Sequence, residues 1–297
     1  MSISFCSRLF GSAVGILMFL GTPATLASAN LEIVKVADGV YAAFVNPLTR
    51  LGANSGFVIG EKAVWVFDTQ RPDVSAELLS EIRKLTSGPV KFVIHSHHHD
   101  ERVDGNSVFT EATIIGHANM RRNLIANPSP TARLPDITYE EELIFHDGER
   151  ELRLLHLGRA HTDGDSLLFL PREKVLFIGE LLPSKGRSGG FREAYVKDFI
   201  QTLDKILALD FDWIIPGRGE SLATKDDLRK FQNYIAGVMN EVQKFVDRDA
   251  TYEETLAGVK VPDYITSESR SRPAFSMLWG AMVRRTYEEL KGARNED

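Results

Sequence analysis

The sequence predicts an α/β (α+β) protein in which two β-sheets pack together and helices cover their outer faces. Short β-rich runs alternate with helical patterns, and the second half of the chain repeats the order of strands followed by helices found in the first half. The chain has 297 residues, of which 43% are hydrophobic and 26% charged, as is typical of a globular protein long enough for one large domain. No linker or low-complexity segment divides residues 30–297, so we expect one domain with a helical C-terminal tail.

The first half of the chain begins with a meander of short strands separated by turns that contain glycine. The predicted strands cover residues 31–36, 40–45, 55–59 and 63–67. Asp73 then has the position of an N-cap for a helix through Leu85, in which apolar residues recur at helical spacing. The apolar run at 90–94 follows this helix and suits a buried strand.

The second half continues with more short strands before its helices begin. The predicted strands cover residues 113–115, 142–145, 151–155, 166–170, 175–178 and 213–215. A helix is predicted over 193–209. The tail is helical from Thr224, because Thr224 to Asp227 resembles a capping box in which Asp stands in for Glu, and a last amphipathic helix is predicted from Pro273 to Leu290.

The N-terminal 29 residues have the pattern of a cleaved secretory signal peptide. Arg8 precedes an apolar stretch at 9–20, and the small-x-small sequence at 27–29 comes directly before Asn30. A membrane anchor is the alternative, but the apolar stretch is too short to span a bilayer comfortably. We therefore expect export to the periplasm or the medium, without a stable anchor after cleavage.

Cleavage would leave a chain without any thiol, since Cys6 is the only cysteine. A metal site would then use imidazole and carboxylate ligands, which suit zinc and also iron or manganese. The net charge of -6 would become -7 through the loss of Arg8. No basic stripe interrupts this acidic balance, which argues against nucleic acid as a partner.

Four histidines occur within five residues in the segment 94–102, directly after a predicted buried strand. A solvated turn or an accidental histidine tract is the alternative, but tracts of the expression-tag kind lie at a terminus. An alternating His-x-His pattern can aim two imidazoles at one ion, so the segment indicates metal ligation. By contrast, His117, His146 and His156 have no such pattern, and we expect them to pack or to cap.

Three further loops at strand ends carry polar residues that would converge on the same edge. His161 lies in a glycine-containing turn at 158–166, Glu180 follows Gly179 at the end of a strand, and Arg218 lies in Pro216-Gly217-Arg218-Gly219. The order of these four loops, spread over nearly the whole chain, predicts one composite site.

These motifs resemble the metallo-β-lactamase superfamily, whose pattern is His-x-His-x-Asp-His, a later Gly-x-x-His, a Gly-Asp after a strand and a final Gly-His. The likeness runs from the early strand at Gly56 to Gly217 and implies a four-layer αββα sandwich. The best register aligns 96–102 with the first motif, which leaves His95 and His98 outside the ligand positions. A competing register, with His95, His97 and Asp100 as ligands, would place His95 inside the strand.

The resemblance implies that three histidines hold one metal, and these map to His97, His99 and His161, all of which are present. This implies one zinc ion, with iron and manganese as the other ions that the ligand types suit.

The positions that would hold a second metal have all changed. They map to Glu101, Arg102 and Arg218, and the bridging aspartate maps to Glu180. Arginine stays protonated and offers only donors, so a dinuclear site is not expected. The two guanidinium groups would instead replace the charge of the missing ion and pair with the two glutamates, while Glu180 would still contact the remaining metal.

A three-histidine centre leaves an open position for water, so the resemblance implies a mononuclear hydrolase that cleaves an ester, lactone, thioester or lactam bond of a small molecule. Glu101 would orient or deprotonate the water, and Arg102 or Arg218 would stabilise an oxyanion or hold an anionic substrate group. Two alternatives stay open: a non-catalytic relative that binds an anion, and an iron-containing redox or sulfur-handling protein.

Overall fold

The computed structural model describes residues 1, 30–46, 52–129 and 131–292 of the chain. The predicted signal peptide and Cys6 lie outside these residues. None of the helices in the described ranges is long and apolar enough to cross a membrane.

Two β-sheets form the centre of the molecule. The larger sheet pairs its strands in sequence order, namely β1 (Asn30–Ala37), β2 (Val40–Asn46), β3 (Ser55–Ile59), β4 (Val64–Phe67), β5 (Val90–Ile94), β6 (Thr113–His117) and β7 (Ile137–Tyr139). The smaller sheet has the order β12-β11-β10-β9-β8, with β8 (Glu142–Asp147), β9 (Arg150–Leu155), β10 (Leu167–Leu170), β11 (Val175–Gly179) and β12 (Trp213–Pro216). The strands from β4 to β7 pair in parallel, and so do β11 and β12, whereas the other neighbours are antiparallel.

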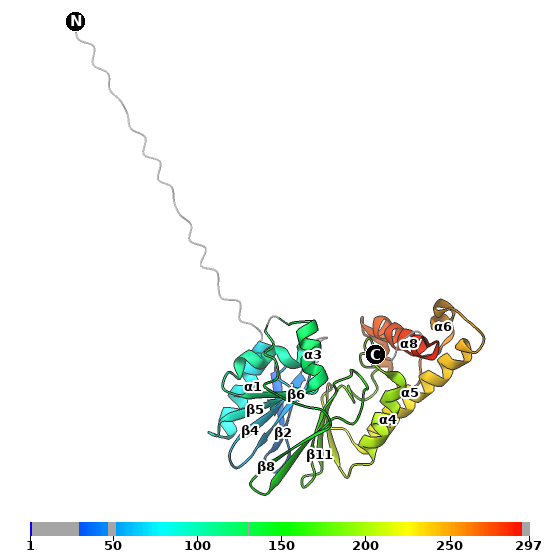
Figure 1. Cartoon of the computed structure of the whole chain (residues 1–297). Helices are drawn as coiled ribbons and strands as arrows, with labels where there is room; N and C mark the ends of the chain where they lie inside the picture. Colours follow the sequence, from blue (N-terminus) through cyan, green and yellow to red (C-terminus); the bar gives the residue numbers. More distant parts are fainter. Residues whose placement is uncertain (2–29, 47–51, 130, 293–297) are drawn as a thin grey trace.

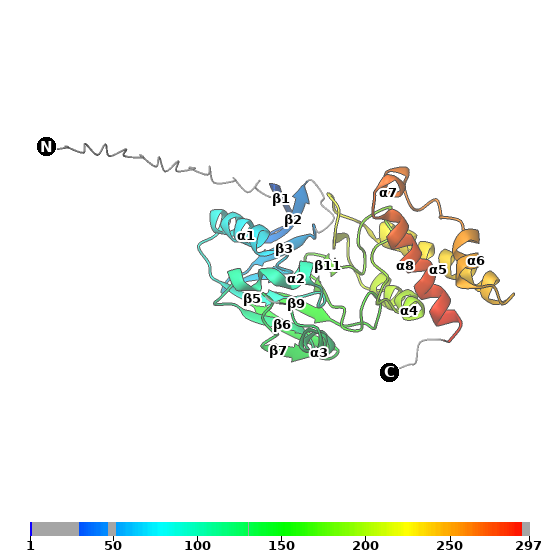
Figure 2. The same cartoon turned by 90° about the horizontal axis from the view of Figure 1, so that it is seen from above.

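Helices cover both outer faces of this pair of sheets (Figures 1 and 2). On the side of the larger sheet lie α1 (Pro72–Leu85), α2 (Asp100–Val103), the 3-10 turn η1 (Asp104–Val108) and α3 (Ala118–Ala126). On the side of the smaller sheet lie α4 (Val196–Leu207), α5 (Lys225–Val246), α6 (Tyr252–Gly258), α7 (Ser267–Ser271) and α8 (Phe275–Leu290).

Three apolar clusters join these layers. The middle cluster packs side chains of both sheets, such as Phe67 and Phe177, whose ring centroids are 5.6 Å apart. One outer cluster buries Leu78 and Ile82 of α1 against the larger sheet. The other outer cluster buries the apolar face of α4, α5 and α8 against the smaller sheet. The predicted αββα sandwich is therefore confirmed.

Several predicted boundaries need correction. The N-cap of α1 is Arg71 and not Asp73, because Pro72 occupies the first turn, and the Asp73 carboxylate pairs with the Arg71 guanidinium instead. Helix α4 begins at Val196 rather than at Glu193, because the backbone of Tyr195 is not helical, with φ -107° and ψ 86°. The Tyr195 N–H instead bonds to the Ala160 carbonyl of another loop.

The C-terminal helices follow the prediction more closely. The capping box at Thr224 and Asp227 is present at the start of α5, and α8 begins two residues after the predicted Pro273. Several short elements were not predicted, among them β7 and α3. These two are too short, at 3 and 9 residues, to show a clear apolar period.

Candidate metal centre and the adjoining ion-pair network

The sequence-predicted site residues gather at one edge of the two sheets, where the carboxyl ends of parallel strands lie. His97 and His99 follow β5, and His161 lies in the loop between β9 and β10. Glu180 follows β11, and Arg218 follows β12. Crevices beside the carboxyl ends of parallel strands commonly bind ligands because several loops converge there.

Three imidazoles meet at this edge. The ligand nitrogens of His97, His99 and His161 all lie within 4.8 Å of one another. His99 Nδ1 is 3.1 Å from His97 Nε2 and 3.1 Å from His161 Nε2. Two nitrogens on one tetrahedral zinc ion, each about 2.0–2.1 Å from the metal, are roughly 3.3 Å apart. The spacing of the three nitrogens therefore fits one metal ion.

The second nitrogen of each ring faces an acceptor. His161 Nδ1 is 2.7 Å from the carbonyl oxygen of Gly190, and His99 Nε2 is 3.5 Å from Glu193 Oε2. His97 Nδ1 is 3.0 Å from the Ser96 hydroxyl, whose own proton goes to Asp68 Oδ2 at 2.8 Å. Protons on these outer nitrogens leave a lone pair on each inner nitrogen. Three lone pairs that converge in this way, with His99 Nδ1 3.1 Å from each of the other two nitrogens, suit a cation between them.

Burial keeps two of these imidazoles neutral. Desolvation lowers the pKa of His97 well below its ordinary value and lowers the pKa of His161 to about 4. Burial acts in the same direction on His99, but Glu193 and Glu101 outweigh it and raise its pKa. Neutral imidazoles bind a metal without first releasing a proton.

The four positions that depart from the family pattern form one network of ion pairs. Glu180 Oε1 accepts from Arg102 Nη2 at 2.5 Å and from Arg218 Nε at 2.5 Å. Arg218 Nη2 also donates to Glu101 Oε1 at 2.6 Å. Burial would raise the pKa of Glu180, but Arg218 and Arg102 outweigh it and lower this pKa to about 2. The structure thus brings the two arginines and the two glutamates together as the sequence predicted.

Both guanidinium groups are largely occupied by acceptors of the protein itself. Arg102 is fully buried and also donates to the Gly217 carbonyl at 3.1 Å. Arg218 uses its remaining nitrogen on the Gly52 carbonyl at 2.8 Å, and its side chain is 20% exposed. Of the two arginines, only Arg218 therefore presents surface to a substrate.

Two glycines explain why the loops after β11 and β12 can approach so closely. A Cβ on Gly179 would lie 2.4 Å from the Ser96 Cβ, and the φ angle of Gly179 is +55°. A Cβ on Gly217 would lie 2.4 Å from the Gly179 carbonyl oxygen. Only glycine fits at these two positions. The close approach of the two loops brings Glu180 and Arg218, the residues that follow the two glycines, into one ion pair.

The competing ligand set is not assembled. His95 Nε2 lies 2.7 Å from Asn106 Oδ1, in the second layer around the centre, and Asp100 is exposed at the start of α2. His98 contacts Glu193 rather than the three-histidine group, with 3.3 Å between Nε2 and Oε2. The register that uses His97 and His99 is the one that the fold brings together with His161.

Of the remaining histidines, His117 and His156 have the structural roles expected of them, whereas His146 neither packs nor caps. His117 caps α3 by accepting from the backbone N–H of Asn119, and its ring stacks on His156 with 4.0 Å between centroids. His146 is exposed on β8. The contact of Glu193 with the histidines was not predicted from the sequence. Glu193 precedes an amphipathic run, so it was predicted to be the first residue of a helix.

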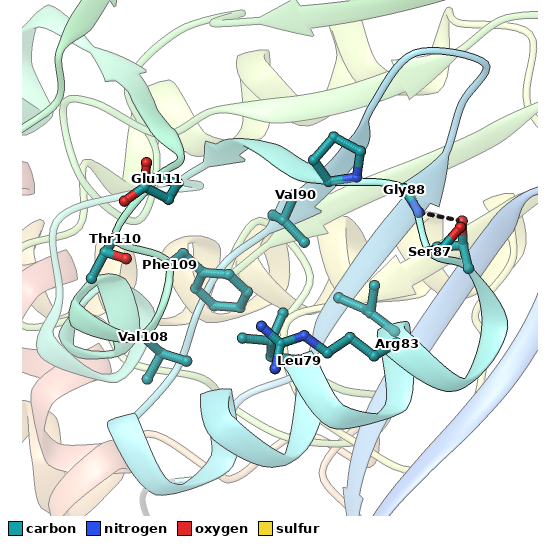
Figure 3. Close-up of a pocket in the computed structure, with 12 residues that line it drawn as sticks. Leu79, Arg83, Ser87, Gly88, Val90, Val108, Phe109, Thr110 and Glu111 are labelled. Atoms are coloured by element: carbon teal, nitrogen blue, oxygen red, sulfur yellow. Dashed lines mark hydrogen bonds between the residues drawn. The ribbon is translucent and has the colours of Figure 1, made fainter.

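A cavity of about 380 Å³ lies elsewhere, between α1, the loop before β5 and the residues after η1 (Figure 3). Leu79, Val90 and Phe109 contribute apolar surface, and the charged side chains of Arg83 and Glu111 also line it. The residues of the candidate metal centre are not among those that line it.

Comparisons with known proteins agree with the geometry. A sequence model described as the metallo-beta-lactamase superfamily matches residues 48–218. The chain is 28% identical over 196 residues to metallo-beta-lactamase IND-1 of Chryseobacterium indologenes, covering 64% of this chain and 79% of that protein. It is 22% identical over 280 residues to a linear primary-alkylsulfatase of a Pseudomonas species, covering 74% of this chain and about half, 52%, of the sulfatase.

Among solved structures, a metallo-beta-lactamase from Pontibacter korlensis superimposes with a TM-score of 0.63 at 20% identity. The superposition covers 69% of this chain and 99% of that protein. This likeness concerns the fold alone, and it leaves nearly a third of the present chain without a counterpart.

Proposed function

The chain belongs to the metallo-β-lactamase superfamily, and from this membership we propose that it is a mononuclear metal-dependent hydrolase with zinc at His97, His99 and His161. The convergence of three inner nitrogens, each with its outer nitrogen turned to an acceptor, is the observation that carries this proposal. A bound zinc ion with three histidine ligands supplies an open position at which it lowers the pKa of water and polarises the substrate. Contact between Glu180 and this ion stays a prediction.

The second half of the site would act through its charges. Arg102 and Arg218 carry two positive charges, the same number as one divalent ion, and they hold Glu180 between them. We therefore propose that the arginines take the electrostatic place of a second metal. Arg102 supports Glu180 from inside the protein, and Arg218 adds positive potential near a developing oxyanion.

Glu101 would orient the attacking water. Burial would raise the pKa of its carboxyl, but Arg218 and Arg102 outweigh it and lower this pKa. The carboxylate is therefore ionised at neutral pH and accepts hydrogen bonds, but it is a weak base. Accepting a hydrogen bond from the water suits such a group better than removing its proton does.

The substrate classes proposed are esters, lactones, thioesters and lactams, and the similarity to an alkylsulfatase adds primary alkyl sulfates. The deciding experiment measures bound metal by elemental analysis and hydrolysis of this panel, for wild type and His97→Ala. His146→Ala is the matched control because His146 is exposed on β8. We expect wild type and His146→Ala to bind about one equivalent of zinc and to hydrolyse one substrate class. His97→Ala should lose both the zinc and the activity.

Other outcomes distinguish the alternatives. Iron in place of zinc, with no hydrolysis, would favour the redox or sulfur-handling hypothesis. Bound zinc with no turnover on any class would favour the non-catalytic relative. A His97→Ala variant that keeps both metal and activity would show that the centre lies elsewhere.

We also propose that the protein is exported and that it acts on a small molecule rather than on nucleic acid. The signal-peptide pattern before Asn30 and the net charge of -6 support these points. Cell fractionation together with N-terminal sequencing tests export, and a mature N-terminus at Asn30 is expected.

A further inference from the structure

We propose that Glu193 is a positioning residue for the metal ligand His99, and that the C-terminal helix α8 holds Glu193 in place. This inference rests on the proposed metal at His97, His99 and His161. Glu193 Oε2 lies 3.5 Å from His99 Nε2 and 3.3 Å from His98 Nε2, so one carboxylate oxygen faces two neighbouring rings.

The three residues His98, His99 and Glu193 could also be taken for a second metal site, since their ligand atoms lie within 4.8 Å of one another. The proton on His99 argues against this. A neutral imidazole has one lone pair, and His99 directs Nδ1 to the three-histidine centre. Its Nε2 then carries a proton, which the Glu193 carboxylate is placed to accept. Carboxylates in this position fix the orientation of a metal-bound imidazole and raise its basicity.

The loop that carries Glu193 is fixed on both sides. The backbone N–H of Tyr195 donates to the carbonyl of Ala160 at 2.7 Å, next to the ligand His161. On the other side, Arg285 Nε of α8 donates to the carbonyl of Ala194 at 2.9 Å. The residue after Glu193 is therefore tied to the last helix of the chain.

Helix α8 also supplies the cap that α4 lacks. Tyr195, the N-cap residue of α4, makes no side-chain capping bond. The Glu289 carboxylate of α8 instead accepts from the backbone N–H of Val196 at 2.8 Å and of Lys197 at 3.1 Å. An acidic group at a helix N-terminus satisfies free N–H groups and interacts favourably with the helix dipole. Together, Arg285 and Glu289 set where α4 begins and thereby where Glu193 lies.

Helix α8 is itself well anchored. Trp279, Met282 and Val283 are buried in the apolar cluster that α8 shares with α4 and α5. The family sequence model ends at residue 218, so α8 lies outside the part of the chain that it matches. The tail would thus contribute to the metal centre through the loop before α4, without reaching the metal itself.

The first test compares zinc affinity in wild type, Glu193→Gln and Glu193→Asp by competition with a chromophoric chelator. Loss of such a partner typically weakens metal binding about 10–100-fold, which we expect for Glu193→Gln with the stoichiometry unchanged. Glu193→Asp should recover part of the affinity. Glu111→Gln, an exposed glutamate far along the chain from this loop, should bind zinc as wild type does.

The second test uses a readout that a loss of folding would not produce. In the cobalt-substituted protein, Glu193→Gln should shift the visible absorption bands, because the orientation and basicity of His99 change, whereas Glu111→Gln should leave them unchanged. Arg285→Ala and Glu289→Gln should each weaken zinc binding by a smaller factor than Glu193→Gln.

Three results would overturn the proposal. Unchanged affinity and an unchanged cobalt spectrum in Glu193→Gln would show that Glu193 does not position His99. Loss of one of two bound equivalents would show that Glu193 is a ligand. Wild-type affinity in both Arg285→Ala and Glu289→Gln would remove the role of α8. If wild type bound no zinc, the proposed function would fail as well. Two equivalents in wild type would overturn its mononuclear part, whereas the first and third results leave the proposed function standing.

Discussion

The two halves of the candidate centre lie at the same sheet edge but handle charge in opposite ways. On one side, His97, His99 and His161 bring three imidazole nitrogens together, and a metal cation would complete this group. On the other side, Arg102 and Arg218 carry permanent positive charges that are already paired with carboxylates. The histidine half needs an added metal ion to balance its lone pairs, whereas the charges of the arginine half are balanced by carboxylates of the protein itself.

This difference has an energetic consequence. Removing a metal leaves the buried imidazoles of His97 and His161 neutral, so no unpaired charge is created there. Removing Arg102 leaves the buried Glu180 with Arg218 alone and the buried Asp68 without its arginine, which costs far more than the pairs themselves contribute. We therefore expect changes in the histidine half to appear mainly in metal binding, and changes in the arginine half to appear mainly in stability.

The largest effect is expected for His97→Ala. Structural zinc in zinc-finger peptides binds with about 10–16 kcal/mol, and on this scale the loss of one of three protein ligands should cost roughly 5 kcal/mol of metal affinity. Competition with a chelator measures the affinity, and the unfolding free energy of the metal-free variant should stay close to that of wild type. A large loss of stability in the metal-free protein would contradict the division between the two halves.

Arg102→Met should act in the opposite way. It leaves Glu180 and Asp68 buried beside a methyl group, so we expect the metal-free protein to lose about 3–5 kcal/mol in urea denaturation. Arg122→Met is the control, since Arg122 pairs with Asp163 at the surface, where such pairs contribute about 1 kcal/mol or less. Similar losses in the two variants would show that the buried network has no special energetic role.

The ion-pair network around Glu180 should also make the free energy of unfolding depend on pH in the acid range. The pKa of Glu180 is about 2 in the folded protein against an ordinary value of 4.5, so its contribution is fully present above about pH 4.5 and is lost as the pH falls toward 2. The full contribution is about 3 kcal/mol. Urea denaturation of metal-free wild type and Glu180→Gln between about pH 2 and 5 measures it, and the steeper acid dependence should belong to wild type.

The smallest effect is expected for Arg218→His, which should leave the metal stoichiometry at one. Arg102 would still lie against Glu180 and occupy the space of a second ion. The fourfold change Glu101→Asp, Arg102→His, Glu180→Asp and Arg218→His should raise the stoichiometry to two. Two equivalents in the single variant would show that Arg218 alone excludes the second metal.

Much of this centre is already apparent in the chain itself. The alternation of His97 and His99 after a buried strand, and His161 before another, predicts three metal ligands, and the fold brings these three side chains together. The simultaneous presence of Glu101, Arg102, Glu180 and Arg218 at the positions of a second site predicts a coupled ion-pair network. Most strands are located within one or two residues, since apolar alternation reports directly on burial.

Other features depend on residues that are distant in sequence and could be found only in the folded molecule. In the sequence alone, nothing indicates that Arg102 is more buried than other charged residues. It is fully buried because the loops after β4, β11 and β12 pack around it in the folded protein. Glu193 reaches His99 from more than ninety positions along the chain, and α8 caps α4 from a similar separation. Local sequence determines which residues can ligate, pair or cap. Tertiary packing decides which of them meet, because contacts between distant segments leave no period in the sequence.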